Sequence, residues 1–260
     1  MRKISTVSLI GSGRVATILA KALKERDVVI NDVYSRQLKN AKTLAKEVNA
    51  RATASLSILS KNSDLYIIAV KDDVITKVVN DLAQYLPETA FVVHTSGATA
   101  ATVLKVFPNH GIFYPLQSFS PARQLNFSQV PFCLSATNEN LFIQLENLVK
   151  QLGAPTYRID DQQRAYLHVA AVFVNNFTNY CYHIAHQITA HQDIPFELLQ
   201  PLILETALKL QDGTPQELQT GPAIRNDQKT MQRHLALLPQ EDWKYLYELI
   251  SQSIQKMDSK

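Results

Sequence analysis

The segment LIGSGRVATILAKAL, residues 9–23, decides the prediction of the fold. An apolar run ends at Ile10, two glycines follow, and the next residues have the apolar spacing of a helix. Gly11, Gly13 and Ala16 match the pattern G-x-G-x-x-A at this strand-to-helix turn. The first glycine permits the tight turn, the second lets a pyrophosphate approach the backbone, and Ala16 permits close packing of helix on strand. The segment therefore predicts a dinucleotide-binding turn.

Strand-like and helix-like segments alternate through the first half of the chain. The run LYIIAV, residues 65–70, has no in-and-out alternation, which is typical of a strand covered on both faces. We expect an α/β fold with a doubly wound, parallel, Rossmann-type sheet, followed by an all-α domain. The expected strands are 6–10, 28–34, 64–70, 91–94, 112–114, 132–135 and 156–159, and the expected helices are 15–26, 38–48, 74–86 and 139–152.

The character of the sequence changes after residue 160, because only helical patterns follow. We predict a dinucleotide-binding domain at residues 1–160 and a helical domain for substrate binding and dimerisation at residues 161–260.

The composition is that of a soluble globular protein, with 46% hydrophobic and 19% charged residues among 260. The net charge is +3 and no basic run occurs, so we expect no nucleic-acid partner. No apolar stretch approaches the ~20 residues of a membrane helix, and the N-terminal apolar run is too short for a signal peptide. We expect a cytoplasmic protein. Cys133 and Cys181 lie in apolar stretches and predict neither a disulfide framework nor a metal site.

The end of the second strand bears on the choice of cofactor. In VVINDVYSR, residues 28–36, Asp32 lies inside the strand, whereas Ser35 and Arg36 follow it. An acidic residue at the strand end is typical of NAD sites, whereas a hydroxyl and a guanidinium suit the 2′-phosphate of NADP. The alternative is that Arg36 is an ordinary surface residue. We favour NADP, with Arg14 of the glycine turn as a further contact.

Two later strand ends, in AVKDD (69–73) and VVHTSGA (92–98), are expected to border the same cofactor. His94 has an alternative role, in which it only closes the edge of the sheet. The predicted cofactor-binding residues are Gly11, Ser12, Gly13, Arg14, Val15, Ala16, Ser35, Arg36, Val70, Lys71, His94, Thr95, Ser96 and Gly97.

A long helix without charge opens the second half, because residues 165–192 contain no Asp, Glu, Lys or Arg. At 100° per residue, its amides and imidazoles share one arc of roughly 100°. A helix without charges is expected to be buried in a core, a subunit interface or an active-site cleft. The residues of the arc are His168, Asn175, Asn176, Asn179, His183 and His186. Their spacing indicates no metal site.

The stretch TGPAIRNDQKTMQRHL, residues 220–235, combines a chain break with several charges. We expect Asn226 or Asp227 to cap the helix that follows. Arg225 lies in the irregular segment before the cap, where it could bind a carboxylate or phosphate. His234 is expected to be a packing residue.

Taken together, these motifs resemble the Rossmann-like NADP oxidoreductases related to deazaflavin-coenzyme-dependent NADP oxidoreductases and pyrroline-5-carboxylate reductases. The resemblance covers essentially the whole chain. It implies a C-terminal helical domain that forms a homodimer, with the cleft between the domains. The matching segments are GSGRVA (11–16), HTSGA (94–98), YPLQSFS (114–120), HVAAVFVNNF (168–177) and GPAIRND…RHL (221–235).

The sequence therefore predicts an NADP-dependent oxidoreductase that reduces a small C=O or C=N substrate. His168 is the expected proton donor, Asn176 the residue that orients the substrate, and Arg225 the partner of an acid group. The alternative is a non-catalytic NADP(H)-binding sensor or regulatory dimer. A methyltransferase that uses S-adenosylmethionine is disfavoured by the helical second half and by Ser35-Arg36.

Overall fold

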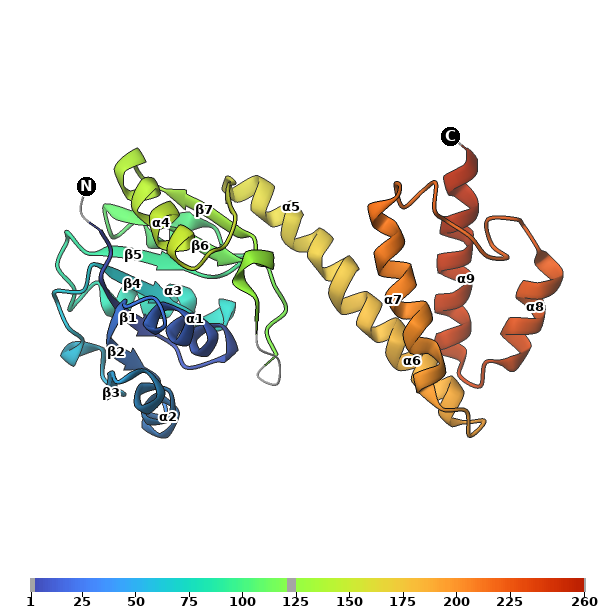
Figure 1. Cartoon of the computed structure of the whole chain (residues 1–260), viewed down its shortest axis with the longest axis horizontal. Coiled ribbons are helices and arrows are strands. Elements are labelled where there is room, and N and C mark those ends of the chain that lie inside the picture. Colours follow the sequence, from blue (N-terminus) through green and yellow to red (C-terminus); the bar gives the residue numbers. More distant parts are fainter. Residues whose placement is uncertain (1–2, 121–124, 260) are drawn as a thin grey trace. The chain divides into compact units, whose positions relative to one another are not determined.

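The computed structural model describes residues 3–120 and 125–259 (Figure 1). Met1 and Arg2, the first residues of the predicted nucleotide domain, and Lys260, the last of the helical one, lie outside the described residues. The chain forms two compact units, of which the first ends at Val172 and the second begins at Phe173.

The first unit is built on an eight-stranded sheet with the order β3-β2-β1-β4-β5-β6-β7-β8. All neighbouring strands are parallel except β6 and β7, which are antiparallel. The strands are β1 Thr6–Ile10, β2 Val29–Tyr34, β3 Arg51–Thr53, β4 Leu65–Ile68, β5 Phe91–His94, β6 Asn109–Pro115, β7 Phe132–Ala136 and β8 Thr156–Arg158. This sheet confirms the predicted fold class, although the short β3 had not been predicted.

Helices cover both faces of the sheet, which explains the continuous apolar strands. Helices α1, α2 and α4 pack on one face, where Val7 and Leu9 are fully buried, and α3 packs on the other against Tyr66 and Ile68. The helices are α1 Arg14–Lys24, α2 Leu38–Val48, α3 Asp72–Leu82 and α4 Glu139–Gln151, with short 3-10 turns η1 Leu56–Ile58, η2 Ala101–Leu104 and η3 Phe127–Gln129.

The uncharged segment is helical but is not a uniform α-helix. Helix α5 (Asp161–Ala171) is followed directly by a π-helical turn, η4 (Val172–Phe177), and then by α6 (Thr178–Ala190). The hydroxyl of Thr178 donates to the carbonyl of Phe173 at 3.0 Å, across this wider turn. The predicted polar arc assumed 3.6 residues per turn throughout, and a π turn interrupts that spacing. The arc is therefore wrong as a single stripe from His168 to His186.

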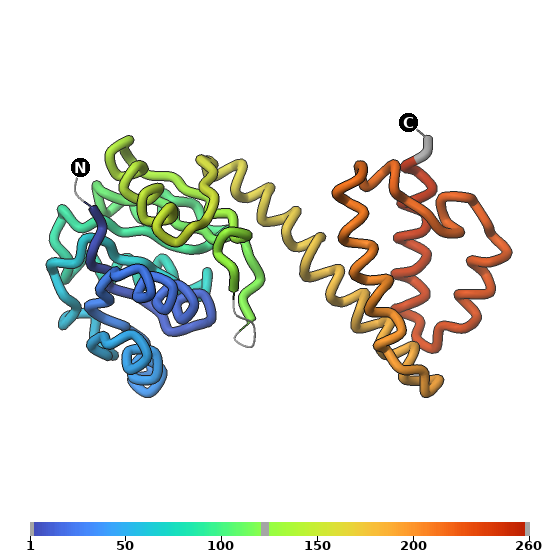
Figure 2. Tube along the Cα trace, in the orientation of Figure 1, coloured from blue at the N-terminus to red at the C-terminus, as the bar shows by residue number. Residues whose placement is uncertain are grey.

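The second unit is all-helical in its described residues, as predicted (Figure 2). Few of its large side chains are buried; Met231 and Trp243 are the main ones. After α6 it contains η5 Phe196–Leu199, α7 Gln200–Leu208, η6 Lys209–Gln211, α8 Gln228–Leu237, α9 Glu241–Gln255 and η7 Lys256–Ser259. No helix among the described residues is long and apolar enough to cross a membrane.

Candidate functional site

The glycine turn lies between β1 and α1 and has the geometry of a phosphate-binding turn. Gly11 has φ +132°, and a Cβ there would lie 2.1 Å from the carbonyl oxygen of Ala69, so only glycine fits. Gly13 is the N-cap of α1, and apart from its chain neighbours no atom of the described residues lies within 4 Å of the Cβ that it lacks. No described side chain caps α1, so the first N–H groups of the helix have no side-chain partner among the described residues.

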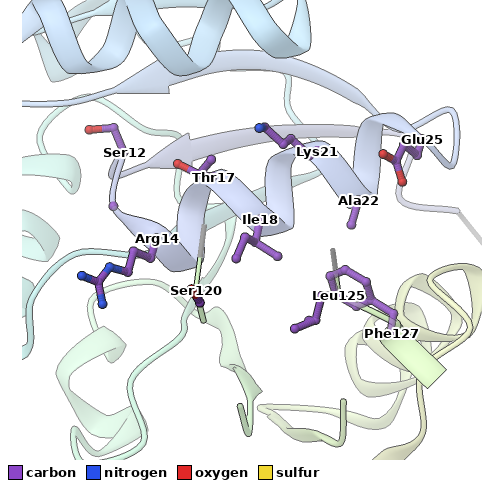
Figure 3. Close-up of a pocket in the computed structure, with 11 residues that line it drawn as sticks. Ser12, Arg14, Thr17, Ile18, Lys21, Ala22, Glu25, Ser120, Leu125 and Phe127 are labelled. Atoms are coloured by element: carbon purple, nitrogen blue, oxygen red, sulfur yellow. The ribbon is translucent and has the colours of Figure 1, made fainter. Parts of the chain in front are cut away.

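A pocket of about 630 Å³ adjoins this turn (Figure 3). It lies between α1 and the segment that carries Ser120, Leu125 and Phe127. Ser12, Gly13 and Arg14 line one end of the pocket, and the remainder runs along α1 to Glu25. The pocket thus reaches only part of the predicted cofactor site. Of the other predicted residues, Gly11, Val15 and Ala16 belong to the glycine turn and the start of α1, and the rest follow or end β2, β4 and β5.

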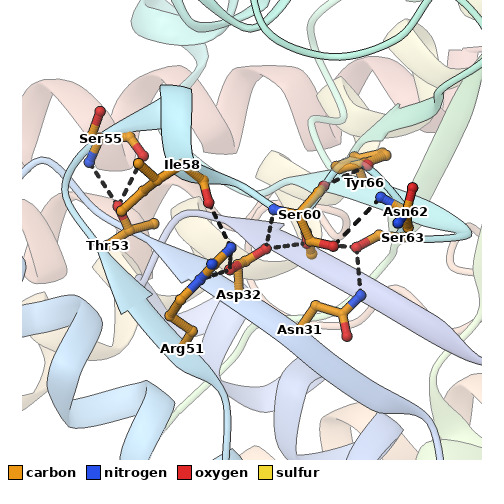
Figure 4. Close-up of polar contacts among 11 residues, drawn as sticks. Asn31, Asp32, Arg51, Thr53, Ser55, Ile58, Ser60, Asn62, Ser63 and Tyr66 are labelled. Carbon is orange, nitrogen blue, oxygen red and sulfur yellow. Dashed lines mark hydrogen bonds and ion pairs between the residues drawn. The ribbon is translucent and has the colours of Figure 1, made fainter.

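The acidic residue of β2 is fully buried and its oxygens are already occupied (Figure 4). Oδ2 of Asp32 accepts hydrogen bonds from the hydroxyl of Ser8 at 2.9 Å and from the backbone N–H of Ser60 at 2.7 Å. Oδ1 accepts from Nε of Arg51 at 2.7 Å. Asp32 therefore stabilises the joint between β1, β2 and β3, and no oxygen remains for a ribose.

Ser35 and Arg36 follow β2, as the sequence predicts. The backbone N–H of Ser35 bonds to the carbonyl of Thr53 at 3.0 Å, which fixes the strand exit. The side chain of Arg36 is exposed and has no hydrogen bond or ion pair within the described chain. Its guanidinium is free to bind an anion.

His94, at the end of β5, holds the following loop in place. It is fully buried, its Nδ1 accepts from the N–H of Ser96 at 3.2 Å, and its Nε2 lies 3.4 Å from the carbonyl oxygen of Ala100. Burial lowers the pKa of His94 to about 4, so the ring is neutral at pH 7. This geometry favours the alternative role, in which His94 supports the sheet edge.

The rest of this loop, with Val70 and Lys71 after β4, forms the edge of the sheet beside the glycine turn. The hydroxyl of Ser96 accepts from the N–H groups of Ala98 and Thr99, and the N–H of Thr95 donates to the carbonyl of Ile68. Thr95 and Ser96 are therefore fixed mainly by the protein itself, which makes the loop a rigid support.

Gly97 is the point where three elements meet. A Cβ on Gly97 would lie 2.5 Å from Nδ1 of His168 and 2.8 Å from the hydroxyl oxygen of Tyr114. These two side chains are themselves in contact, because the Tyr114 hydroxyl lies 3.3 Å from Nδ1 of His168. The structure thus brings His168 to the carboxyl edge of the sheet, where open α/β sheets bind ligands.

Helix α5 is anchored to this edge by two charged residues. Arg164 is 1% exposed, pairs with Asp161 at 2.8 Å and donates to the carbonyl of Thr99. The other oxygen of Asp161 accepts from the N–H of Ala101 at 2.8 Å. His168 lies one turn after Arg164 on the same helix face. These contacts explain why α5 groups with the first unit, although the predicted division falls at residues 160/161.

Neither Tyr114 nor Arg164 was assigned a role from the sequence. Tyr114 belongs to the motif YPLQSFS, which was noted only for its resemblance. Arg164 follows Asp161 by three residues, the spacing of an ordinary surface pair, so nothing local indicated its burial.

The other two predicted catalytic residues belong to the second unit. Asn176 lies in the π-helical turn and is exposed. Arg225 is exposed and precedes Asn226, whose φ is +53°. Asp227 caps α8, as predicted, since its carboxylate accepts from the N–H of Thr230 at 3.1 Å. The structure keeps Asn176 and Arg225 accessible, and their catalytic roles stay predictions.

Comparison with known proteins identifies the family. Residues 2–118 match a family model described as a Rossmann-like domain, and residues 130–254 match one described as a domain of unknown function (DUF2520). A crystal structure of a "putative NADP oxidoreductase" from Bacteroides fragilis is 37% identical, covers 97% of this chain and 98% of its own, and superposes with a TM-score of 0.91. The chain belongs to this family of Rossmann-like DUF2520 proteins. The resemblance noted in the sequence is thereby confirmed.

More distant structures share the fold of the Rossmann-like DUF2520 family. A protein from Thermotoga maritima is 20% identical over 96% of this chain and 97% of its own, with a TM-score of 0.72. An imine reductase from Myxococcus stipitatus, in complex with NADP+, is 17% identical over 98% of this chain and 94% of its own, with a TM-score of 0.71. No curated protein matches the sequence significantly.

Proposed function

We propose that this chain is an NADP-dependent oxidoreductase that transfers a hydride between the nicotinamide and the carbon of a small C=O or C=N substrate. One observation carries the proposal: an open glycine turn and a half-buried Tyr114–His168 pair lie on the same carboxyl edge of one sheet. The name of the Bacteroides fragilis relative, an NADP oxidoreductase, supports the same class.

The residues of the first unit fit a dinucleotide. The open space at Gly13 and the uncapped start of α1 suit a pyrophosphate, which the segment from Gly11 to Ala16 would hold. Ser35 and the free guanidinium of Arg36 suit a 2′-phosphate. Val70 and Lys71 would border the nicotinamide. When bound, the cofactor supplies or accepts the hydride.

Asp32 supports the preference for NADP over NAD. A carboxylate that binds the ribose hydroxyls is typical of NAD sites, and β2 contains no acidic residue other than Asp32. Because Ser8, Arg51 and Ser60 already donate hydrogen bonds to its oxygens, Asp32 is not available to bind the ribose hydroxyls.

The protein's own chemistry is to orient the substrate and to supply a proton. His168 is the proton source, since an imidazole changes charge near neutral pH. Arg225 would neutralise an acid group of the substrate and Asn176 would orient it. These assignments extend the predictions made from the sequence.

We also infer that a second copy of the chain covers the second unit. Large apolar side chains on and near the π turn are exposed in the single chain, namely Phe173 (62%), Val174 (76%) and Phe177 (52%). Exposed apolar surface of this extent is typical of subunit interfaces. In this homodimer of a cytoplasmic enzyme, the uncharged helix is buried against the second copy, as its composition predicts.

The test of the function is a reduction assay with a matched binding measurement. The purified protein is expected to oxidise NADPH in the presence of at least one member of a panel of small ketones, keto acids and cyclic imines. NADPH binding without oxidation across the panel would instead favour a nucleotide sensor, and S-adenosylmethionine binding without NADPH binding would favour a methyltransferase.

A further inference from the structure

Tyr114 carries a hydroxyl to which the proposed function assigns no chemical role. It lies on β6, opposite Cys133 of the antiparallel neighbour β7, near the strand's carboxyl end. Its hydroxyl lies 3.3 Å from Nδ1 of His168, and the two rings meet edge to face with centroids 6.2 Å apart. A tyrosine of the sheet and a histidine of α5 therefore form one polar pair.

The pair lies directly against the loop that follows β5. An added Cβ on Gly97 would be 2.7 Å from Cζ of Tyr114 and 2.5 Å from Nδ1 of His168, so both side chains contact the backbone there. Neither side chain is fully buried. A small molecule bound at this edge could therefore reach the pair.

The hydroxyl of Tyr114 keeps its proton at neutral pH. Burial raises the pKa of Tyr114 to about 12, and Cys133 on β7 and Asp72 on α3 act in the same direction. The buried cation of Arg164 on α5 acts in the opposite direction. The phenol can therefore donate a proton only if it regains one at once, and Nδ1 of His168 is within hydrogen-bond reach.

We propose that Tyr114 is a further catalytic residue, whose hydroxyl passes the proton of His168 to the substrate atom being reduced. The inference rests on the proposed function. Nδ1 of His168, the ring nitrogen nearest Gly97, faces the Tyr114 hydroxyl. A proton that leaves Nδ1 therefore passes to this hydroxyl, which is the group of the pair that donates to the substrate.

The O–H bond of Tyr114 breaks as the substrate oxygen or nitrogen takes the proton, while the substrate carbon receives the hydride that NADPH would supply on being oxidised to NADP+. The Tyr114 oxygen takes a proton from Nδ1 of the protonated His168. His168 is left neutral and regains a proton from water.

The first arm of the test needs no cofactor. The ¹⁵N resonances of labelled histidines are recorded by NMR at one pH in the wild type, in Tyr114→Phe and in the control Tyr157→Phe, which removes an exposed hydroxyl. His168→Asn assigns the resonance. We expect Tyr114→Phe alone to shift the Nδ1 resonance of His168, because the hydroxyl that contacts this nitrogen is removed. An unchanged Nδ1 resonance of His168 in Tyr114→Phe would overturn the pair.

The second arm measures NADPH oxidation with pyruvate and 2-methyl-1-pyrroline as C=O and C=N probes. Tyr114→Phe is expected to lower kcat by about 10²–10⁴-fold, the usual contribution of a general acid, with the Kd of NADPH unchanged. Near wild-type turnover in Tyr114→Phe would overturn the relay and leave the proposed function intact. Absence of NADPH binding by the wild type would end the proposed function itself, whatever the NMR result. The NMR arm decides the pairing even if neither probe is reduced.

Discussion

Arg51 binds Asp32 through two nitrogens, with Nε at 2.7 Å and a terminal guanidinium nitrogen at 2.6 Å from the same oxygen, Oδ1. The carboxylate is fully buried and the guanidinium half exposed. The pair joins β2 to β3 and prevents the acid of β2 from facing a nucleotide. Ser35 and Arg36 are then the side chains that a nucleotide would meet at the end of β2. Their hydroxyl and guanidinium are the basis for expecting NADP.

The variant Asp32→Asn tests whether Asp32 stabilises the fold rather than contacting the nucleotide. The substitution keeps the shape but removes the charge that Arg51 binds, so we expect the free energy of unfolding to fall by about 1.5–3 kcal/mol in urea denaturation. The ratio of the Kd values for NADH and NADPH is expected to stay as in the wild type. The control Glu88→Gln removes an exposed carboxylate and is expected to change neither quantity. A changed cofactor ratio with unchanged stability would mean that Asp32 contacts the nucleotide.

Two glycine variants separate folding from cofactor binding. Gly11→Ala places a Cβ against the backbone of Ala69 at a φ of +132°, so a loss of stability of at least about 1–3 kcal/mol is expected. Gly13→Ala adds a methyl group in open space at φ −76°, so the unfolding free energy is expected to stay within about 0.5 kcal/mol. Gly13→Ala should nevertheless weaken NADPH binding, because the methyl occupies space meant for the pyrophosphate. Unchanged NADPH affinity in a stable Gly13→Ala protein would argue against pyrophosphate binding at the turn from Gly11 to Ala16.

The lowered pKa of His94 predicts that the free energy of unfolding depends on pH. Its pKa is lowered to about 4 in the folded chain, against 6.5 when unfolded, so between these values the unfolded chain binds more protons. Stability is therefore expected to fall as the pH drops from about 6.5 to about 4, by up to about 1.4 kcal/mol per pH unit from this residue. Denaturation curves of the wild type and His94→Gln at several pH values measure this contribution as a difference. Parallel pH profiles for the two proteins would show that His94 does not carry it.

The proposed dimer is tested by placing a charge on its apolar surface. Val174 is 76% exposed in the single chain, and a buried aspartate without a partner is costly. Sedimentation velocity is expected to give twice the chain mass for the wild type and for the control Gln192→Glu, and a monomer for Val174→Asp. A wild-type monomer at all concentrations, or a dimeric Val174→Asp, would contradict the assignment of this surface.

The sheet and its first turn could be predicted because their signals are local. The apolar runs and the glycine spacing around Gly11 identify strands and a turn without knowledge of their neighbours. The strand β3 was missed because three residues, one of them Arg51, carry too weak a pattern. The π turn was missed because a change of helical pitch leaves the composition unaltered.

The parts of the site that depend on distant contacts could not be predicted. Arg164 donates to the carbonyl of Thr99 across 65 residues of sequence, and Tyr114 meets His168 across 54. His94 had two open roles, and only its burial separates them. In the first unit, composition and spacing predict most strands and helices. The contacts between side chains that are distant in sequence follow only from the folded structure.

The most direct test of the central claim is a calorimetric titration of the protein with NADPH, NADH and S-adenosylmethionine, repeated on Arg36→Ala and on the exposed control Arg26→Ala. NADPH is expected to bind most tightly of the three. Arg36→Ala is expected to weaken NADPH binding about 10–100-fold, which corresponds to the loss of a charged hydrogen bond. NADH binding by Arg36→Ala, and NADPH binding by Arg26→Ala, are expected to change little. Equal affinity for NADPH and NADH in the wild type would contradict the 2′-phosphate site, and binding of neither nucleotide would contradict the oxidoreductase.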